Sequence, residues 1–239
     1  MKKRIIELDG KKILYTVVSS KRARHPFIRI DAETGLSLVK PDGMKLNNVP
    51  EILEYKASWI LKKLEKYKPV NNGARRHVKD GDSFCLLGAS YRINIDITAS
   101  NRLSVIQTER DINIFVPENG NDSPSDILKK WCKKTAREVI SNRAQIHAAT
   151  MDVKYNRISI RDQKTRWGSC SSGKNLSFNW RIIMAPLEIV DYLIYHELCH
   201  LIELNHSKKF WAQMSYYCPD FKERKKWLRA EGLKLRTQI

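Results

Sequence analysis

The stretch from Tyr195 to Trp211 constrains this chain more than any other. Its residues 196–200 read H-E-x-x-H, and a third histidine, His206, follows. On a helix, residues four apart project from one face, so His196 and His200 can both reach one metal ion. Glu197 lies about 100° further round the helix, where it can reach a water on the metal without being a ligand. The stretch therefore predicts a metal site with Glu197 as its general base.

The third histidine follows a break in the helical pattern. Asn205-His206-Ser207 interrupts the apolar spacing, and Ser207 is a good N-cap for a further helix. Three protein ligands and one open position are typical of catalytic zinc, whereas structural zinc usually has four protein ligands. We therefore expect Zn²⁺ to be held by His196, His200 and His206, with Cys199 buried and not a ligand. The alternative is that all three histidines are ordinary surface or core residues.

The elements before the motif provide a setting for a substrate. A helix beginning at Pro186 carries apolar residues on the face opposite the two histidines. A short strand at 157–161 and a hairpin at 163–180, with its turn at 172–175, precede this helix. This order places an edge strand beside the motif helix, where an extended peptide could add as a further strand.

The predicted chemistry is the hydrolysis of an amide. Glu197 takes a proton from a zinc-bound water, the hydroxide attacks a carbonyl, and Glu197 returns the proton to the leaving amine. The resulting oxyanion needs a second stabilising group, and the sequence does not choose among its candidates. They are Tyr192, Tyr195, Tyr216, Arg166 and Arg181.

These residues also carry a family resemblance. The segments are Lys164-Thr165-Arg166-Trp167-Gly168-Ser169-Cys170, Asn179-Trp180-Arg181, Ala185-Pro186, residues 195–200, and Asn205-His206-Ser207 with Phe210-Trp211. They resemble the YgjP-like zinc metallopeptidases, which are related to the SprT-like and WLM peptidases. The resemblance covers residues 157–230 specifically and the N-terminal part more loosely. It implies zinc at His196, His200 and His206, with Glu197 catalytic. The His200–His206 spacing equals that of metzincins, but Glu203 replaces their glycine and no Met-turn is evident.

The rest of the chain predicts an α+β protein of two domains. We expect an antiparallel β-rich domain with one helix at 1–120, and a zincin-like helical domain with a small sheet at 121–239. The boundary rests on the polar segment 117–123, and Asn71-Asn72-Gly73 is a candidate linker. Helices are expected at 50–68, from Ser123 to about 148, and from about Asp220. No internal sequence repeat is evident.

Charge and composition set the partners that we expect. The net charge of +18 admits a nucleic acid at a basic surface, besides a protein or peptide substrate. The alternative functions are therefore a DNA-associated protease and a zinc-stabilised nucleic-acid-binding protein without peptidase activity, together with a hydrolase of non-peptide amides. Five scattered cysteines favour reduced thiols. Without a signal peptide or a long apolar run, we expect a cytoplasmic protein with no membrane contact.

Overall fold

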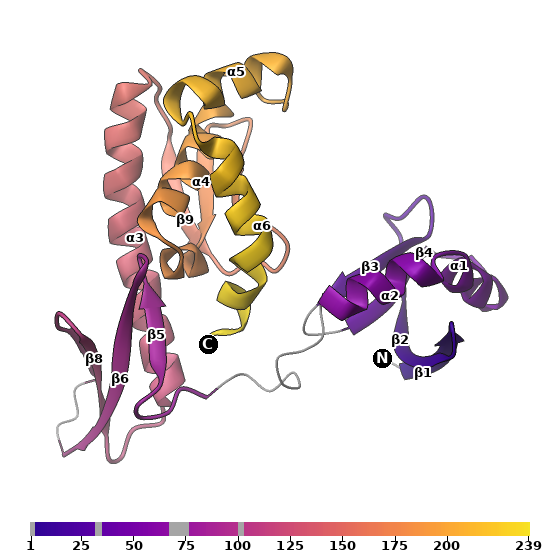
Figure 1. Ribbon diagram of the computed structural model, residues 1–239, viewed down its shortest axis with the longest axis horizontal. Helices are drawn as coiled ribbons and strands as arrows, with labels where there is room; N and C mark the ends of the chain where they lie inside the picture. The colour runs from indigo at the N-terminus through magenta and orange to yellow at the C-terminus, as the bar shows by residue number, and fades with distance from the viewer. Residues whose placement is uncertain (1–2, 32–34, 67–76, 100–102) are drawn as a thin grey trace. The chain divides into compact units, whose positions relative to one another are not determined.

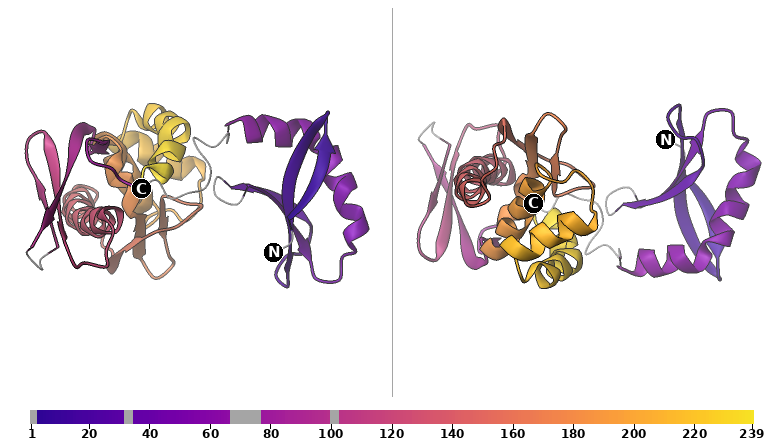
Figure 2. Two further views of the ribbon diagram at one scale, coloured as in Figure 1. Left: turned by 90° about the horizontal axis from the view of Figure 1, so that it is seen from below. Right: turned by 90° about the horizontal axis from the view of Figure 1, so that it is seen from above.

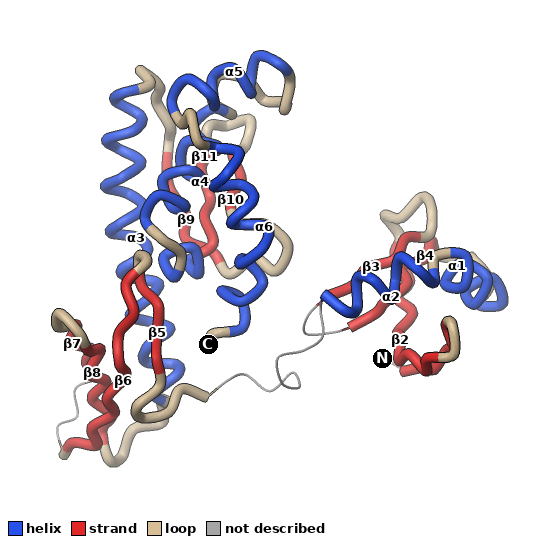
Figure 3. The backbone as a smooth tube through the Cα atoms, viewed as in Figure 1, coloured by secondary structure: helices blue, strands red, loops and turns tan. Residues whose placement is uncertain are grey.

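A computed structural model describes residues 3–31, 35–66, 77–99 and 103–239. The protein is α+β, as predicted, and these residues form helices and three small sheets (Figure 1, Figure 3). The chain forms two compact units, Met1–Ala74 and Arg75–Ile239. The candidate linker Asn71-Asn72-Gly73 lies outside the described residues. In the described ranges, no helix is both long and apolar enough to cross a membrane.

The first unit is a four-stranded sheet followed by helices. Its elements are β1 (Lys3–Leu8), β2 (Lys11–Ser20), β3 (Phe27–Asp31), β4 (Gly35–Pro41), the short 3-10 helix η1 (Leu46–Asn48), α1 (Val49–Tyr55) and α2 (Ala57–Lys66). A tight turn joins β1 to β2, with positive φ at both Asp9 (46°) and Gly10 (74°). The single helix expected at 50–68 is interrupted at Lys56, which caps α1 with a φ of −107°.

The second unit begins with another four-stranded sheet. Its strands are β5 (Ser83–Leu86), β6 (Ala89–Thr98), β7 (Ser104–Gln107) and β8 (Asp111–Pro117). The prediction of purely antiparallel pairing was wrong here and in the first unit, because β6 pairs with β8, and β2 with β4, in parallel. Burial explains the arrangement: β8 carries Ile112 and Ile114, both fully buried, and therefore takes a central position beside β6.

The two sheets have the same topology. The strand order is β1-β2-β4-β3 in the first and β5-β6-β8-β7 in the second. In each sheet, the first two strands are joined by a two-residue turn whose second residue is a glycine, Gly10 or Gly88, with positive φ. The chain therefore contains a structural repeat that the sequence does not reveal.

The boundary between the units differs from the predicted one at residue 120. The long helix α3 (Pro124–Thr150) is capped at Ser123, whose side chain accepts from the Asp126 N–H. Its Leu128 and Cys132 share one buried cluster with Ile93 and other residues of the second sheet. Because this sheet buries its apolar face against α3, it belongs to the same unit (Figure 2).

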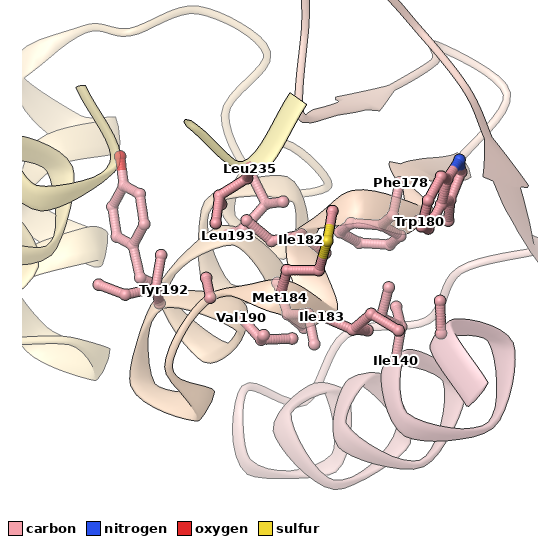
Figure 4. Close-up of a cluster of buried hydrophobic side chains, with 14 of the residues drawn as sticks. Ile140, Phe178, Trp180, Ile182, Ile183, Met184, Val190, Tyr192, Leu193 and Leu235 are labelled. Carbon is pink, nitrogen blue, oxygen red and sulfur yellow. The ribbon is translucent and has the colours of Figure 1, made fainter. Parts of the chain in front are cut away.

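The remaining elements of the second unit surround the motif helix. They are β9 (Arg157–Arg161), β10 (Gly168–Cys170), β11 (Asn175–Asn179), the 3-10 helix η2 (Trp180–Met184), α4 (Leu187–Cys199), α5 (Lys208–Tyr217) and α6 (Phe221–Thr237). The sheet order β10-β11-β9 makes β10 an edge strand, as predicted. Phe178, Trp180 and Ile140 form part of the core beneath α4 (Figure 4).

A partly buried cluster of polar side chains joins α4 to α3. Asp191 of α4 accepts hydrogen bonds from the Arg143 guanidinium and, at 2.9 Å, from His147 Nε2. Burial alone would raise the pKa of Asp191, but the hydrogen bonds from His147 and Arg143 lower it below its usual value. These hydrogen bonds fix the helix that carries the motif against the longest helix of the unit.

Candidate metal centre

Two helices and the turn between them bring the three histidines together. His196 lies on the last turn of α4, and His200 is the residue that caps the end of that helix. Ser207 begins α5, because its hydroxyl accepts a hydrogen bond from the Phe210 N–H at 3.3 Å. His206 therefore lies just before the cap, folded back toward α4. One ligand atom from each histidine lies within 4.8 Å of those of the other two.

Two of the ring nitrogens lie at a separation that suits a shared zinc ion. His196 Nε2 and His206 Nε2 lie 3.1 Å apart, close to the roughly 3.3 Å that separates two nitrogens bound to one tetrahedral zinc ion. His200 Nδ1 donates to the Glu203 carbonyl at 3.1 Å, so its Nε2 keeps a free lone pair. The residues present thus fit a zinc ion with three nitrogen ligands.

The surroundings of His196 and His206 favour the neutral imidazole, the form that binds a metal. Burial, together with the nearby His200, His206 and Lys225, lowers the pKa of His196 to about 3. Burial and the charges of His200 and Lys225 also lower the pKa of His206. Since a metal binds the neutral imidazole, neither ligand has to release a proton at neutral pH.

Glu197 is a buried carboxyl group beside this cluster. Its side chain is only 3% exposed. Burial raises its pKa to about 8, although the charge of Arg166 acts in the opposite direction. In the described part of the chain, neither Glu197 Oε2 nor His196 Nδ1 has a hydrogen-bond partner. Because buried polar atoms without partners are rare, they mark this position as a candidate functional site.

Gly168 on the edge strand β10 leaves the space that the Glu197 side chain occupies. A Cβ atom at Gly168 would lie 2.8 Å from both Cγ and Cδ of Glu197, closer than side-chain atoms normally approach. In the sequence, Gly168 stands out only as part of a segment that resembles the metallopeptidase family. Its role depends on the contact between β10 and α4, which are far apart in sequence.

A firmly held loop carries Arg166 toward Glu197. The Asn179 N–H donates to the Trp167 carbonyl at 2.7 Å, and the Asn179 side-chain amide donates to the Gln163 carbonyl at 2.7 Å. Arg236 of α6 donates to the Lys164 carbonyl and stacks over Trp167 at 4.6 Å from the ring centre. These contacts fix both ends of the segment in which Arg166 lies.

The five candidate oxyanion stabilisers differ in how close they lie to the histidine cluster and Glu197. The Tyr192 ring lies 6.1 Å from the His196 ring, and burial raises its pKa to about 12, so it stays a proton donor. Arg166 is close enough to act on the Glu197 charge. Tyr195 instead stacks on His147 at 4.2 Å.

The other two candidates lie outside this cluster. Tyr216 is 78% exposed and its ring contacts Tyr217 at 4.8 Å. Arg181 is engaged with Asp162 and donates to the Ile239 carbonyl. Tyr192 and Arg166 are therefore the candidates that the geometry favours.

Residues 24–231 match the family described as YgjP-like, metallopeptidase domain. Among solved structures, the chain is similar to the metallopeptidase zymogen of Methanocaldococcus jannaschii jannalysin, at 23% identity and a TM-score of 0.33. That similarity covers 36% of this chain and 93% of the other. No curated protein matches the sequence.

Proposed function

The chain belongs to the YgjP-like metallopeptidase family, and we propose that it is a zinc-dependent peptidase with Glu197 as its general base. One juxtaposition carries the proposal. Three histidine nitrogens lie within 4.8 Å of one another, beside the buried carboxyl group of Glu197, whose Oε2 has no hydrogen-bond partner among the described residues. A structural zinc site does not require such a carboxyl group beside its ligands.

His196, His200 and His206 would hold the ion, leaving one coordination position for other ligands. A bound zinc ion supplies Lewis acidity, which polarises a carbonyl and lowers the pKa of water. The Glu203 carbonyl orients the His200 ring through the hydrogen bond at Nδ1.

Glu197 moves the proton. Its carboxylate accepts a proton from the attacking water and then donates it to the leaving amine nitrogen. Burial favours the protonated carboxyl, so a positive charge is needed to make it a base. Arg166 favours the carboxylate form, and a nearby dication acts in the same direction.

The substrate would lie along β10. This edge strand has one unpaired side, to which an extended peptide can add through main-chain hydrogen bonds. Gly168 places the start of β10 against Glu197, so a peptide on this edge has its main chain beside the general base. Tyr192 and Arg166 are proposed to stabilise the oxyanion.

The proposal is tested by product analysis. The purified chain loaded with zinc is incubated with an unstructured protein, and the fragments are analysed by mass spectrometry. We expect new amino and carboxyl termini at internal peptide bonds, with cleavage abolished by a chelator and restored by added zinc. An intact substrate after prolonged incubation with the zinc-loaded chain would overturn the peptidase function.

Replacing Gly168 by alanine tests the placement of Glu197. The new methyl group would force the carboxyl group away from its position, because its Cγ and Cδ are 2.8 Å from the added carbon. A displacement near 1 Å can lower activity about 10²-fold. We therefore expect kcat for peptide hydrolysis to fall by about that factor, while zinc content stays at the wild-type value.

Gly173 in the turn of the same hairpin provides the matched control. A Cβ atom there would meet the flexible Asn175 side chain at 3.3 Å, so Gly173→Ala is expected to keep the wild-type kcat. Equal rates for the two variants would show that the position of Glu197 does not depend on Gly168.

A further inference from the structure

A basic cleft of about 440 Å³ lies between α5 and α6 in the second unit. It is lined by Trp211, Phe221, Lys222, Lys225, Lys226 and Arg229. Four of these six residues are cationic and none is acidic. The catalytic scheme above uses none of them.

The four cations lie on one face of α6. Positions 222, 225, 226 and 229 have the spacing i, i+3, i+4 and i+7, which places like charges next to one another and destabilises a helix. In the described residues, none of the four pairs with an acidic side chain. Two acidic residues nearby pair with other cations: Asp220 with Arg224 at 2.8 Å, and Glu231 with Lys234 at 2.7 Å.

The cleft also has an aromatic wall. Trp211 and Phe221 stack with ring centres 5.3 Å apart. Lys225 Nζ lies 4.1 Å from the centre of the Trp211 ring. Burial and the neighbouring Arg229 lower the pKa of Lys225. An anion that enters the cleft therefore meets partly desolvated positive charge that lacks a negative partner.

Trp211 joins this cleft to the histidine cluster. Its ring lies 5.6 Å from the ring of His206 and 6.3 Å from that of His196. The charge of Arg229 acts to lower the pKa of the Tyr192 phenol, against the larger effect of burial, and the Tyr192 ring is 6.1 Å from that of His196. One residue of extended peptide spans about 3.3–3.6 Å. A substrate whose carbonyl lies at the histidines can therefore reach the cleft within a few residues.

We propose that this cleft is a substrate subsite that binds a carboxylate of the peptide being cut. The inference rests on the proposed peptidase function and specifies its substrate class. The cations neutralise the carboxylate, and the aromatic wall packs against the apolar part of the bound residue. The enzyme is thereby selective for peptides with an acidic group close to the cleaved bond.

The test uses amidated, otherwise neutral peptides in which one glutamate occupies each position in turn, each paired with its glutamine counterpart. For the zinc-loaded wild type, we expect kcat/KM to be at least about 10-fold higher for the glutamate peptide at one or two positions. The preference should shrink as salt is raised, because the charges are partly exposed. Lys225→Glu should abolish or reverse it, and Lys222→Gln/Lys226→Gln, which leaves the Trp211 contact intact, should reduce it.

Lys133→Glu on α3 is the control, since it makes the same change in net charge on an exposed residue that does not line the cleft. A second arm compares neutral peptides with a free or an amidated C-terminus, which distinguishes a main-chain carboxylate from a side-chain one. Equal rates for every peptide pair would overturn the subsite while leaving the peptidase function intact.

Binding to the Glu197→Gln protein, measured by fluorescence anisotropy, separates the two hypotheses. If the zinc-loaded wild type cuts no peptide, but Glu197→Gln still binds glutamate peptides more tightly than glutamine ones, the carboxylate site stands and the peptidase function fails. A single-stranded oligonucleotide serves as competitor. Tight oligonucleotide binding that depends on Lys225, with no difference within the peptide pairs, would assign the cleft to phosphate and overturn the proposal.

Discussion

Glu197→Gln is expected to lower kcat for peptide hydrolysis by about 10²- to 10⁴-fold, the range that a general base contributes. The glutamine keeps the shape of the side chain but cannot accept the proton of the attacking water. The fold should tolerate the change. Burial raises the pKa of Glu197 to about 8, so without a cation the carboxyl is already largely neutral at neutral pH. Zinc content should be unchanged, because Glu197 is not among the three clustered ligands.

Single-turnover hydrolysis and zinc content measured on the same protein sample separate the proton-transfer role from metal binding. Glu188→Gln is the matched control, because Glu188 is an exposed residue on the first turn of the same helix. Wild-type cleavage in Glu197→Gln would exclude Glu197 as the base. Loss of zinc together with activity would instead indicate that the carboxylate helps to hold the ion.

The candidate site was largely predictable because its parts are local. The i, i+4 spacing fixes the relation of His196 to His200, and a serine N-cap ends one helical pattern and begins the next. These rules act within a few residues, so Ser207 and His206 could be placed correctly before any tertiary contact was known. The edge position of β10 followed from element order in the same way.

What the sequence could not reveal depends on contacts between distant segments. The approach of Gly168 to Glu197 joins residues of a strand and a helix, and a glycine carries no side chain that would mark the contact. The domain boundary was misplaced because alternating strands indicate one buried face but not what covers it. That partner is α3, through Leu128 and Cys132.

The parallel pairs have a similar explanation. Short connections between successive strands favour the expectation of antiparallel neighbours, yet β8 pairs with β6 although β7 lies between them in sequence. The repeated strand order of the two sheets arises from sequences that share alternation and a glycine turn but few identical residues. Only the pairing makes the repeat visible.

His206→Ala is expected to remove zinc from the protein. It deletes one of the three proposed nitrogen ligands, and even the loss of an outer hydrogen-bond partner weakens metal sites about 10- to 100-fold, so we expect a larger loss of affinity here. Zinc at 100 times its dissociation constant would stabilise the wild type by about 2.7 kcal/mol. In His206→Ala the zinc-dependent rise in melting temperature should disappear at the same zinc concentration, while the metal-free proteins should melt alike because Ser207 still caps α5.

Competition with a chromophoric chelator measures the affinities directly. His206→Cys should regain much of the binding, because a thiolate is also a zinc ligand, and His25→Ala, which removes an exposed histidine of the first unit, should leave it unchanged. Retention of stoichiometric zinc at wild-type affinity by His206→Ala would refute the three-histidine site. Loss of zinc in both His206→Ala and His206→Cys, with the metal-free proteins melting as the wild type does, would show that the turn tolerates only an imidazole as its ligand.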